Sequence, residues 1–394
     1  MKQWISLLLT VLLLCTPAAA LAQPSEEELS IGAPAAILIE RETGTVLYEK
    51  NADERLSPAS VTKIMTLLLI FEQLDSGRLS TDTVVTASAN ACAMGGSQIW
   101  LREGEQMTVD EMIKCIAVSS ANDCAVAMAE HICGSEAAFT KRMNERAQAL
   151  GMENTHFLNS TGLTDDPAHY TTARDIAVMS RALLAYPRIR DYTTIWMDTV
   201  RDGTFGLSNT NKLIRFYSGA TGLKTGFTSG AGYCLSASAM RDGMELIAVV
   251  MGAETSQSRN AACKSLLDYG FANFAVVSPD LSDCENQIPV RLGKDAGVSA
   301  VPEADMALLI DKAQKSGVTS EVTLEPTVTA PVSRGQRLGT LTVKSGDQVL
   351  KEVPLVAAQA VERLSYGEIY RMVLMRAAMA KTDTPEAAKI PEKM

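Results

Sequence analysis

Residues 64–74 form a segment that is apolar on nearly every face of the helix that its composition predicts. A helix without a polar face has to be covered on all sides, so it belongs at the centre of a core and not on its surface. Ser57 and Pro58 precede this segment and are a typical N-cap and first-turn proline. The chain has 394 residues, which is enough for two or three domains, one of them built around such a helix.

The other patterned segments come in the order strands, helices, strands, helix. Two β-like runs flank Thr43-Gly44 and two more flank Arg241-Asp242-Gly243, so each pair predicts a hairpin. The hairpin strands are predicted at 35–40, 46–50, 232–239 and 244–251, and helices at 107–132, 136–150, 173–184 and 258–274. This order predicts an α/β (α+β) domain in which a helical region is inserted between the early and late strands of one sheet.

The character of the sequence changes after about residue 278. Short alternating strands, separated by prolines and by the turn Ser345-Gly346-Asp347, predict a small β-rich domain over 284–362 after a larger domain over 30–277. Residues 1–22 have the basic start, the short apolar stretch and the small-x-small end of a secretory signal peptide. The chain closes with a tail over 365–394.

Charge and cysteine usage exclude several classes of partner. The net charge of −10 leaves no basic field for a nucleic acid, so nucleic-acid binding is not expected. The three histidines lack zinc-site spacing, so a structural zinc is not expected. One of the eight cysteines, Cys15, belongs to the signal segment, and the remaining odd number predicts mostly free thiols.

The first motif with chemical potential is Ser60-Val61-Thr62-Lys63. In a helix that begins at Ser60, residues three apart share a face, so the Lys63 amine can reach the Ser60 hydroxyl. A serine becomes nucleophilic when a base takes its proton, and a lysine is a base only when burial or a nearby cation keeps it neutral. Taken alone this spacing is weak, since about one such match is expected by chance in a chain of this size.

Two further triplets follow. Ser120-Ala121-Asn122 lies in an apolar run, where Ser120 could relay protons and Asn122 could hold an amide; the alternative is a solvated turn between helices. Lys224-Thr225-Gly226 opens a β-like run. On an edge strand Lys224 could project into a cleft, Thr225 could bind a carboxylate and Gly226 would allow a ligand backbone to approach; the alternative is a surface turn.

In order and spacing the three motifs together resemble the S-x-x-K, S-x-N and K-T-G set of the penicillin-recognising serine enzymes. The segments 97–101 (SQIWL), 159–163 (NSTGL) and 172–175 (TARD) further resemble low-molecular-weight penicillin-binding proteins of the D-alanyl-D-alanine carboxypeptidase family. The resemblance covers roughly residues 30–360. It implies a β-lactamase/transpeptidase-like catalytic domain with a central antiparallel sheet, followed by a small β-sandwich-like domain.

The same resemblance implies a reaction and its catalytic residues. Ser60 would form the acyl-enzyme, Lys63 would be its base, and Ser120 would assist proton transfer to the leaving D-alanine. The backbone N–H groups of Ser60 and Phe227 would form the oxyanion hole, where negative charge develops in the transition state. The substrate would be the terminal D-alanine of peptidoglycan stem pentapeptides, and β-lactam antibiotics would be covalent inhibitors.

The resemblance also implies binding roles for the remaining motif residues. Asn122 would bind the peptide amide, Lys224 would provide positive potential, and Thr225 would hold the terminal carboxylate. Gly226 would allow the close approach of the substrate. No metal or organic cofactor is implied.

Three rival functions share these motifs. A class A β-lactamase should carry E-x-x-L-N, but Thr155 occupies the glutamate position, Glu153 is two residues out of register, and the extra β domain argues against this function. A D,D-endopeptidase that cuts peptidoglycan cross-links would use the same site. A non-catalytic wall-binding penicillin sensor would be expected to carry damaged motifs, and these are intact.

The signal segment and the tail predict where the protein acts. An exported, extracytoplasmic enzyme would meet peptidoglycan outside the membrane. Over 366–381 apolar residues are interleaved with basic ones, which favours a peripheral membrane anchor at the outer face of the cell membrane. The alternatives are a helix that covers the β domain or a frayed end, because the basic residues do not gather on one face.

Overall fold

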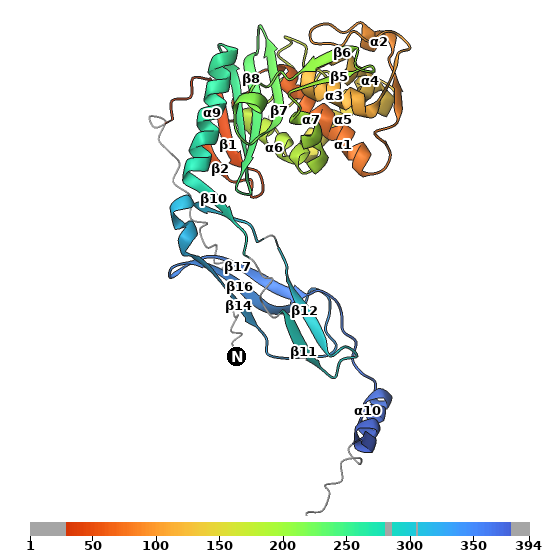
Figure 1. Cartoon of the computed structure of the whole chain (residues 1–394), viewed down its shortest axis with the longest axis vertical. Coiled ribbons are helices and arrows are strands. Elements are labelled where there is room, and N and C mark those ends of the chain that lie inside the picture. Colours follow the sequence, from red (N-terminus) through yellow and green to blue (C-terminus); the bar gives the residue numbers. More distant parts are fainter. Residues whose placement is uncertain (1–28, 280–285, 305, 380–394) are drawn as a thin grey trace, which may run out of the picture. The chain divides into compact units, whose positions relative to one another are not determined.

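The computed structural model describes residues 29–279, 286–304 and 306–379, so the predicted signal peptide and the end of the tail lie outside the described residues. The chain divides into two compact units, one ending at Phe274 and the other beginning at Ala275 (Figure 1). All three sequence motifs belong to the first unit, and the predicted β-rich segment belongs to the second.

A five-stranded antiparallel sheet with the strand order β2-β1-β9-β8-β7 forms the middle of the first unit. Strands from the start of the chain therefore pair with strands from its late part, and the helices between them are an insertion. This arrangement confirms the predicted fold class and both hairpins. The strands are β1 (Ala35–Glu40), β2 (Val46–Lys50), β7 (Ala220–Thr228), β8 (Gly232–Arg241) and β9 (Met244–Ala253).

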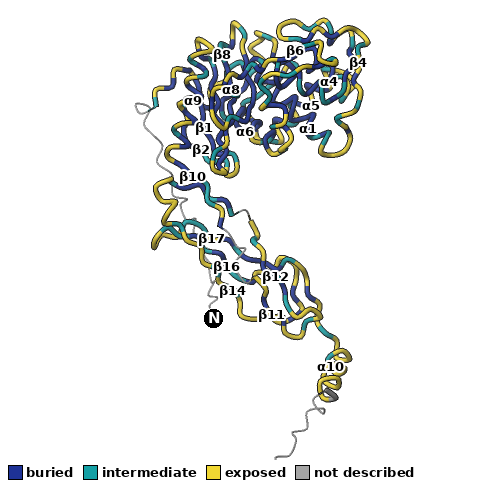
Figure 2. Tube along the Cα trace, in the orientation of Figure 1, coloured by how far each residue is buried: buried dark blue, intermediate teal, exposed yellow. Residues whose placement is uncertain are grey.

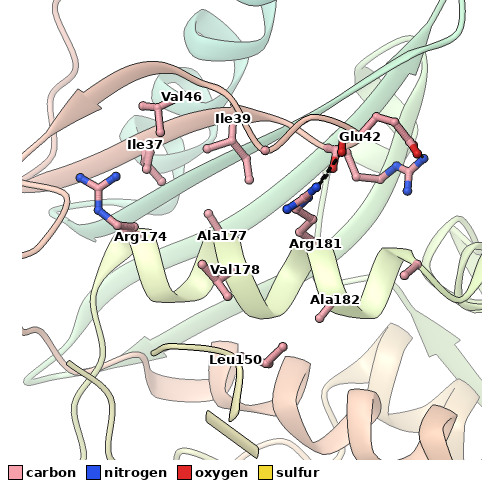
Figure 3. Close-up of a pocket in the computed structure, with 13 residues that line it drawn as sticks. Ile37, Ile39, Glu42, Val46, Leu150, Arg174, Ala177, Val178, Arg181 and Ala182 are labelled. Carbon is pink, nitrogen blue, oxygen red and sulfur yellow. Dashed lines mark hydrogen bonds and ion pairs between the residues drawn. The ribbon is translucent and has the colours of Figure 1, made fainter. Parts of the chain in front are cut away.

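Different helices cover the two faces of this sheet (Figure 1). On one face α9 (Ser256–Asn273) packs on β8 and β9, where the absence of a side chain at Gly270 leaves room for Leu38 and Leu246. On the other face α6 (Ala173–Leu184) packs on β9 and β1, with Ile37 and Ile39 directed toward it (Figure 3). The sheet is therefore buried between two helical layers.

The helix α1 (Lys63–Asp75) lies in the core, as its apolar composition predicts. Every residue from Lys63 to Phe71 is buried, and α4, α5 and α6 all contact α1. The predicted start is wrong: a 3₁₀ turn over Ala59–Thr62 precedes the helix and contains Ser60, and no side chain caps either element. The Ser57 hydroxyl has no hydrogen-bond partner among the described residues. Backbone bonds, such as Val61 N to Pro58 O at 3.1 Å, form the turn instead.

The single helix predicted over 107–132 is also wrong. The segment folds as β4 (Gln106–Thr108), α3 (Val109–Lys114), a π-helical turn (Cys115–Ser119) and α4 (Asn122–Cys133). The break falls at Ser120, which adopts the left-handed conformation with φ +65°. Because both halves are buried, the hydrophobic pattern continues through the break and gives no sign of it.

The other predicted helices of the first unit are confirmed within two residues at each end, as α5 (Glu136–Ala149), α6 and α9. The remaining short elements are β3 (Val84–Thr86), α2 (Ala89–Cys92), α7 (Arg190–Thr193), β5 (Met197–Val200), β6 (Phe205–Ser208) and α8 (Leu213–Phe216). Strand β3 pairs with β4, and β5 pairs with β6. The six cysteines within the described residues are all free, in agreement with the predicted mostly free thiols, and Cys284 lies outside the described residues.

The second unit is built on a six-stranded sheet with the order β14-β16-β17-β12-β11-β15. Its buried side includes Leu338, Leu341, Val353 and Leu355. The predicted strands and the turn at 345–347 are confirmed. The strands are β11 (Gln287–Arg291), β12 (Gly297–Pro302), β14 (Val318–Leu324), β15 (Val328–Thr329), β16 (Arg337–Ser345) and β17 (Gln348–Ala357), and β10 (Phe274–Val277) pairs separately with β13 (Leu308–Asp311).

The last described element is α10 (Tyr366–Met379), which is exposed along nearly all of its described side chains (Figure 2). Met372, Val373, Leu374 and Met375 are among its exposed apolar residues. Within the described part of the chain, no helix has both the length and the apolar character that crossing a bilayer requires.

A hollow of about 610 Å³ lies between α6 and the turn that joins β1 to β2 (Figure 3). Arg181 reaches across from α6 and donates hydrogen bonds to the backbone carbonyls of Arg41 and Glu42, both at 2.6 Å. Gly44 has φ +73°, a left-handed conformation that glycine adopts without strain, and a Cβ there would lie 2.9 Å from Arg181 Nη1. None of the residues of the three sequence motifs lines this hollow.

Candidate active site

Ser60 and Lys63 are joined by a hydrogen bond. Ser60 lies in the 3₁₀ turn and Lys63 is the first residue of α1, so a spacing of three residues places both on one face although the helix begins later than predicted. The Lys63 Nζ atom donates to Ser60 Oγ at 3.0 Å and to the carbonyl oxygen of Thr161 at 2.8 Å. Lys63 is completely buried, so solvent does not separate the amine from the hydroxyl.

The environment of Lys63 favours its neutral form. Burial lowers the pKa of the Lys63 amine well below its usual value, the charge of Lys224 lowers it further, and Asp123 opposes the shift. Because burial is the main cause, the direction holds whether or not Lys224 carries a proton. A neutral amine beside a hydroxyl is the arrangement in which a lysine can take the proton of a serine.

A loop at 159–163 closes over this pair. The Asn159 side chain accepts hydrogen bonds from the backbone N–H groups of Thr161 and Gly162 at 3.1 and 2.7 Å, and this holds the Thr161 carbonyl against Lys63. Gly162 has φ +74°, and a Cβ there would lie 1.8 Å from the carbonyl oxygen of Ala59. Ala59 itself has φ +47°, a strained conformation directly before Ser60.

A buried histidine supports the same turn from the other side. His169 Nδ1 accepts the backbone N–H of Leu158 at 3.0 Å, so in the neutral ring the proton is on Nε2, which donates to Thr62 Oγ1 at 2.8 Å. Burial lowers the pKa of His169 to about 4. His169 is therefore a neutral support for the turn, and its hydrogen bonds do not reach Ser60.

Strand β7 passes directly beside the Ser60 turn. A Cβ at Gly226 would lie 2.6 Å from the carbonyl oxygen of Pro58 and 3.0 Å from the backbone nitrogen of Ser60, so only glycine permits this contact. Phe227 follows, is 53% exposed, and stacks on Tyr233 with ring centroids 4.3 Å apart. The strand is an edge of the sheet, as predicted for this motif.

Lys224 and Thr225 are buried in the middle of β7, not at its start as the sequence pattern suggests. Burial, and after it the charge of Arg259, lowers the pKa of Lys224 to about 7. The amine is thus close to its midpoint of protonation at neutral pH, and an anionic ligand beside it would favour the charged form. Thr225 Oγ1 donates to Thr210 Oγ1 at 2.7 Å.

The left-handed conformation of Ser120 turns the chain at the N-terminus of α4. Ser120 is buried, with 3% of its surface exposed, and its hydroxyl makes no hydrogen bond to another described residue. Thr210 connects this segment with β7, because its backbone N–H donates to the carbonyl of Val118 at 3.1 Å while its hydroxyl binds Thr225.

Asn122 has one satisfied and one unsatisfied end. Its Nδ2 group donates to the carbonyl of Gly95 at 2.8 Å, and its backbone N–H donates to the carbonyl of Ser97 at 2.7 Å. Its Oδ1 atom is buried and has no partner among the described residues. Since an unpaired buried acceptor is costly, this atom is available for an N–H donor of a ligand.

Sequence reasoning missed the roles of several residues that shape the site. Thr161 belongs to the segment 159–163 noted by resemblance, but it acts through its backbone, which leaves no side-chain signal. Asp123 is a buried carboxylate directly after Asn122. Arg259 is distant in sequence and affects Lys224 only after folding. The signal that could have found Asp123 is its acidic side chain in an apolar run.

Among the described residues no cluster of three His, Cys, Asp or Glu side chains could hold a metal.

Comparisons with known proteins agree with this geometry. Residues 21–255 match a family model described as D-alanyl-D-alanine carboxypeptidase, and residues 281–363 match one described as penicillin-binding protein 5, C-terminal domain. The chain is 43% identical over 375 residues to the D-alanyl-D-alanine carboxypeptidase DacF of Bacillus subtilis, covering 93% of this chain and 96% of the relative.

Two solved structures are similar as well. Penicillin binding protein 5 from Haemophilus influenzae superposes with a TM-score of 0.71 at 30% identity, over 87% of this chain and all of that one. Penicillin-binding protein D2 from Listeria monocytogenes, in its ampicillin-bound form, superposes with a TM-score of 0.57 at 32% identity. That match covers 63% of this chain and all of the Listeria chain.

Proposed function

The chain belongs to the D-alanyl-D-alanine carboxypeptidase family of serine peptidases, and from this premise we propose which of its residues carry out the reaction. The protein is a serine-type D-Ala-D-Ala carboxypeptidase and a penicillin-binding protein. The observation that carries the assignment of residues is the buried Lys63 amine 3.0 Å from the Ser60 hydroxyl. A neutral amine beside a hydroxyl supports the assignment of Ser60 as the nucleophile and Lys63 as its base.

In the first step, the Ser60 oxygen attacks the carbonyl carbon of the peptide bond between the last two D-alanines. Lys63 takes the hydroxyl proton as the new C–O bond forms. The C–N bond then breaks, and Lys63 passes this proton through Ser120 to the leaving nitrogen, so that free D-alanine departs, Lys63 is neutral again and an ester remains on Ser60. In the second step, water attacks the ester carbon while Lys63 takes one proton from the water. The ester C–O bond to Ser60 then breaks, and Lys63 returns that proton to the Ser60 oxygen.

The negative charge of each tetrahedral intermediate is assigned to the backbone N–H groups of Ser60 and Phe227. The contact between β7 and the Ser60 turn supports this assignment, because the strand passes so close that a Cβ on Gly226 would lie 3.0 Å from the Ser60 nitrogen. Donors on two segments that touch can point at one oxygen without moving during the reaction.

The remaining residues are assigned to the substrate. Asn122 Oδ1, which lacks a partner in the described structure, would accept a peptide N–H of the stem. Lys224 and Thr225 would hold the terminal carboxylate, and a carboxylate beside Lys224 would raise its lowered pKa. A β-lactam would acylate Ser60 by the same first step and leave slowly.

The test combines intact mass with product analysis. A β-lactam should add its mass to the protein and map to the peptide that contains Ser60, and a stem pentapeptide should release D-alanine. Ser60→Ala should abolish both, while Ser57→Ala, which removes a neighbouring hydroxyl without a partner, should retain both. Labelling of Ser60→Ala equal to that of the wild type would overturn the assignment. Cleavage of a cross-linked dimer with no release from the pentapeptide would favour a D,D-endopeptidase.

We further propose that the catalytic domain spans 30–277, that the β-rich domain spans 284–362, and that the protein acts outside the cytoplasm on peptidoglycan.

Peripheral contact with the outer face of the membrane is assigned to the tail over 365–394. The exposed apolar residues of α10, together with Arg371 and Arg376, support it. Deleting 365–394 should release the protein from membranes; unchanged fractionation would contradict this anchor.

A further inference from the structure

A second hollow of the first unit, about 750 Å³ in volume, lies between the loop at 99–105 and the β5–β6 hairpin. Its lining includes Trp100, Arg102, Glu103, Arg201 and Phe205, so aromatic rings and charges of both signs meet in one place. None of the residues proposed for catalysis or for binding the D-alanine end lines it.

Trp100 is exposed and strained at the same time. Its side chain is 64% exposed and its backbone has φ +56°, a conformation that is rare for a bulky residue. With the Gln98 amide turned so that both of its ends are satisfied, the indole N–H donates to the Gln98 side-chain oxygen at 3.2 Å, and the Gln98 amide nitrogen donates to the carbonyl of Met94 at 2.7 Å. Because most of the Trp100 ring is exposed to solvent, its packing offsets little of the cost of the strained backbone. A strained residue that packing does not explain indicates a function.

Arg201 fixes the opposite wall of the hollow. It also has a left-handed backbone, with φ +56°, and its guanidinium donates to the carbonyl of Ile99 at 2.8 Å and to Glu105 at 2.7 Å. The same guanidinium lies over the Phe205 ring, 5.2 Å from its centroid. The Trp100 and Phe205 rings stand edge to face with centroids 5.9 Å apart, so both are positioned before any ligand arrives.

Hydrogen bonds from backbone N–H groups of the loop at 99–105 connect it to the proposed substrate site. The Asp123 carboxylate, directly after Asn122, accepts the N–H groups of Ile99 and Leu101 at 3.0 and 3.1 Å. Trp100 therefore lies between two residues whose N–H groups are both bound by Asp123. The loop that forms one side of the hollow is therefore anchored to the residue that follows Asn122, which is assigned to the peptide amide.

The chemistry of the lining fits a pyranose ring. The face of an aromatic ring packs against the C–H groups of a sugar, while charged side chains bind its hydroxyl and amide groups. Arg102 and Glu103 are both exposed, and among the described residues neither side chain has a hydrogen-bond or ion-pair partner. A purely apolar ligand would leave these charges unused, and a polyanion would meet Glu103 and Glu105.

We propose that this hollow binds the N-acetylated amino-sugar chain to which the stem peptide is attached, with Trp100 as the stacking surface. The proposal rests on the proposed function, since it takes peptidoglycan as the substrate. It adds a glycan subsite to an enzyme whose chemistry takes place at the peptide end.

The kinetic test compares D-alanine release from a free stem pentapeptide and from the same peptide on its disaccharide. The wild type should prefer the disaccharide-linked substrate in kcat/KM by about tenfold, which corresponds to about 1.4 kcal/mol. In Trp100→Ala this preference should fall toward one, and Trp100→Phe should keep most of it. The matched control is Phe216→Ala, which removes an aromatic side chain that is 69% exposed elsewhere in the unit and should leave the preference unchanged.

Two kinetic outcomes would overturn the proposal: a wild-type preference of one, or a preference that survives in Trp100→Ala. If Trp100→Ala lowers kcat/KM equally for both substrates, the hollow serves the peptide and not the sugar. The rate of acylation by penicillin, measured for each variant, reports whether its active site is still folded.

A binding test is independent of turnover. In the Ser60→Ala background, a peptide-free oligosaccharide of N-acetylglucosamine and N-acetylmuramic acid should change the tryptophan fluorescence, and Trp100→Phe should remove the change. No fluorescence change and no binding by calorimetry would overturn the glycan subsite. Failure of the proposed function would appear differently, as an absence of D-alanine release from both substrates, and the binding test would still decide this proposal.

Discussion

The amine of Lys63 lies 3.0 Å from the hydroxyl of Ser60, and its other described partner, the Thr161 carbonyl, also carries no charge. A buried ammonium group would need a carboxylate as its partner, whereas a neutral amine is satisfied by these two oxygen atoms. The contact therefore favours the unprotonated amine in the resting enzyme, and the lowered pKa of Lys63 has the same physical origin.

Replacing Lys63 by arginine tests this base. Arginine has similar length but stays protonated at any accessible pH, so Lys63→Arg should slow acylation of Ser60 by about 10²–10⁴-fold. The measurement is the rate of labelling by a fluorescent penicillin, with Lys141→Arg, a change on the exposed face of α5, as the matched control. A Lys63→Arg protein that melts like the wild type and is labelled at a similar rate would contradict the role of Lys63.

Because Gly162 lies directly against the Ala59 carbonyl, we expect replacement of Gly162 by alanine to lower the free energy of unfolding strongly. Gly162→Ala places a methyl group at 1.8 Å from that oxygen in addition to the left-handed strain, so the free energy of unfolding should fall by at least about 3 kcal/mol. Gly151 has nearly the same φ, +76°, with no atom within 4 Å of its Cβ position, so Gly151→Ala should cost only about 1 kcal/mol. Urea denaturation measures both, and equal losses would refute the close approach.

The neutral His169 predicts a stability loss in mild acid. Because burial lowers its pKa from 6.5 to about 4, the unfolded chain binds a proton between these values that the folded chain does not. This contribution is complete above pH 6.5 and is lost as the pH falls toward 4, up to about 3 kcal/mol. The unfolding free energy of His169→Gln, measured at pH 7, 6, 5 and 4, should therefore fall less steeply than that of the wild type. Parallel curves would show that His169 titrates normally.

Lys224 should make the unfolding free energy depend on pH in the alkaline range, above pH 7. Its pKa is lowered from 10.5 to about 7, so between these values the unfolded chain again binds the extra proton and stability rises with pH. The contribution from this group reaches about 1.4 kcal/mol per pH unit. The unfolding free energy of Lys224→Met should consequently rise less between pH 7 and 10 than that of the wild type. An identical rise in both proteins would mean that Lys224 is not desolvated in the folded state.

Much of the architecture could be predicted from local pattern. The helix α1 has no polar face, and the turn of the β8–β9 hairpin carries Asp242-Gly243, both with positive φ. The break at Ser120 could not be predicted, because apolar residues line both α3 and α4 and the periodicity does not record a single left-handed residue. The start of α1 differs from the sequence pattern for a related reason, since packing and backbone bonds override an available capping residue.

In the candidate active site, too, some features could be predicted from local sequence and others could not. Ser60 and Lys63 could be paired from their spacing, because three residues make a face in a 3₁₀ turn as well as in an α-helix. The partners that tune them could not, because Thr161 acts through a carbonyl group and Arg259 comes close only when α9 packs on the sheet. Long-range packing carries no local sequence signature.

Every residue assigned to chemistry or substrate lies between positions 60 and 227, inside the unit that ends at Phe274. Substitutions in the six-stranded β unit can therefore accumulate under different selection from those in the groove, since none of them alters a group that makes or breaks a bond. The two units can in this way diverge at different rates during evolution, although both belong to one polypeptide. A change in the second unit leaves every assigned catalytic group in place.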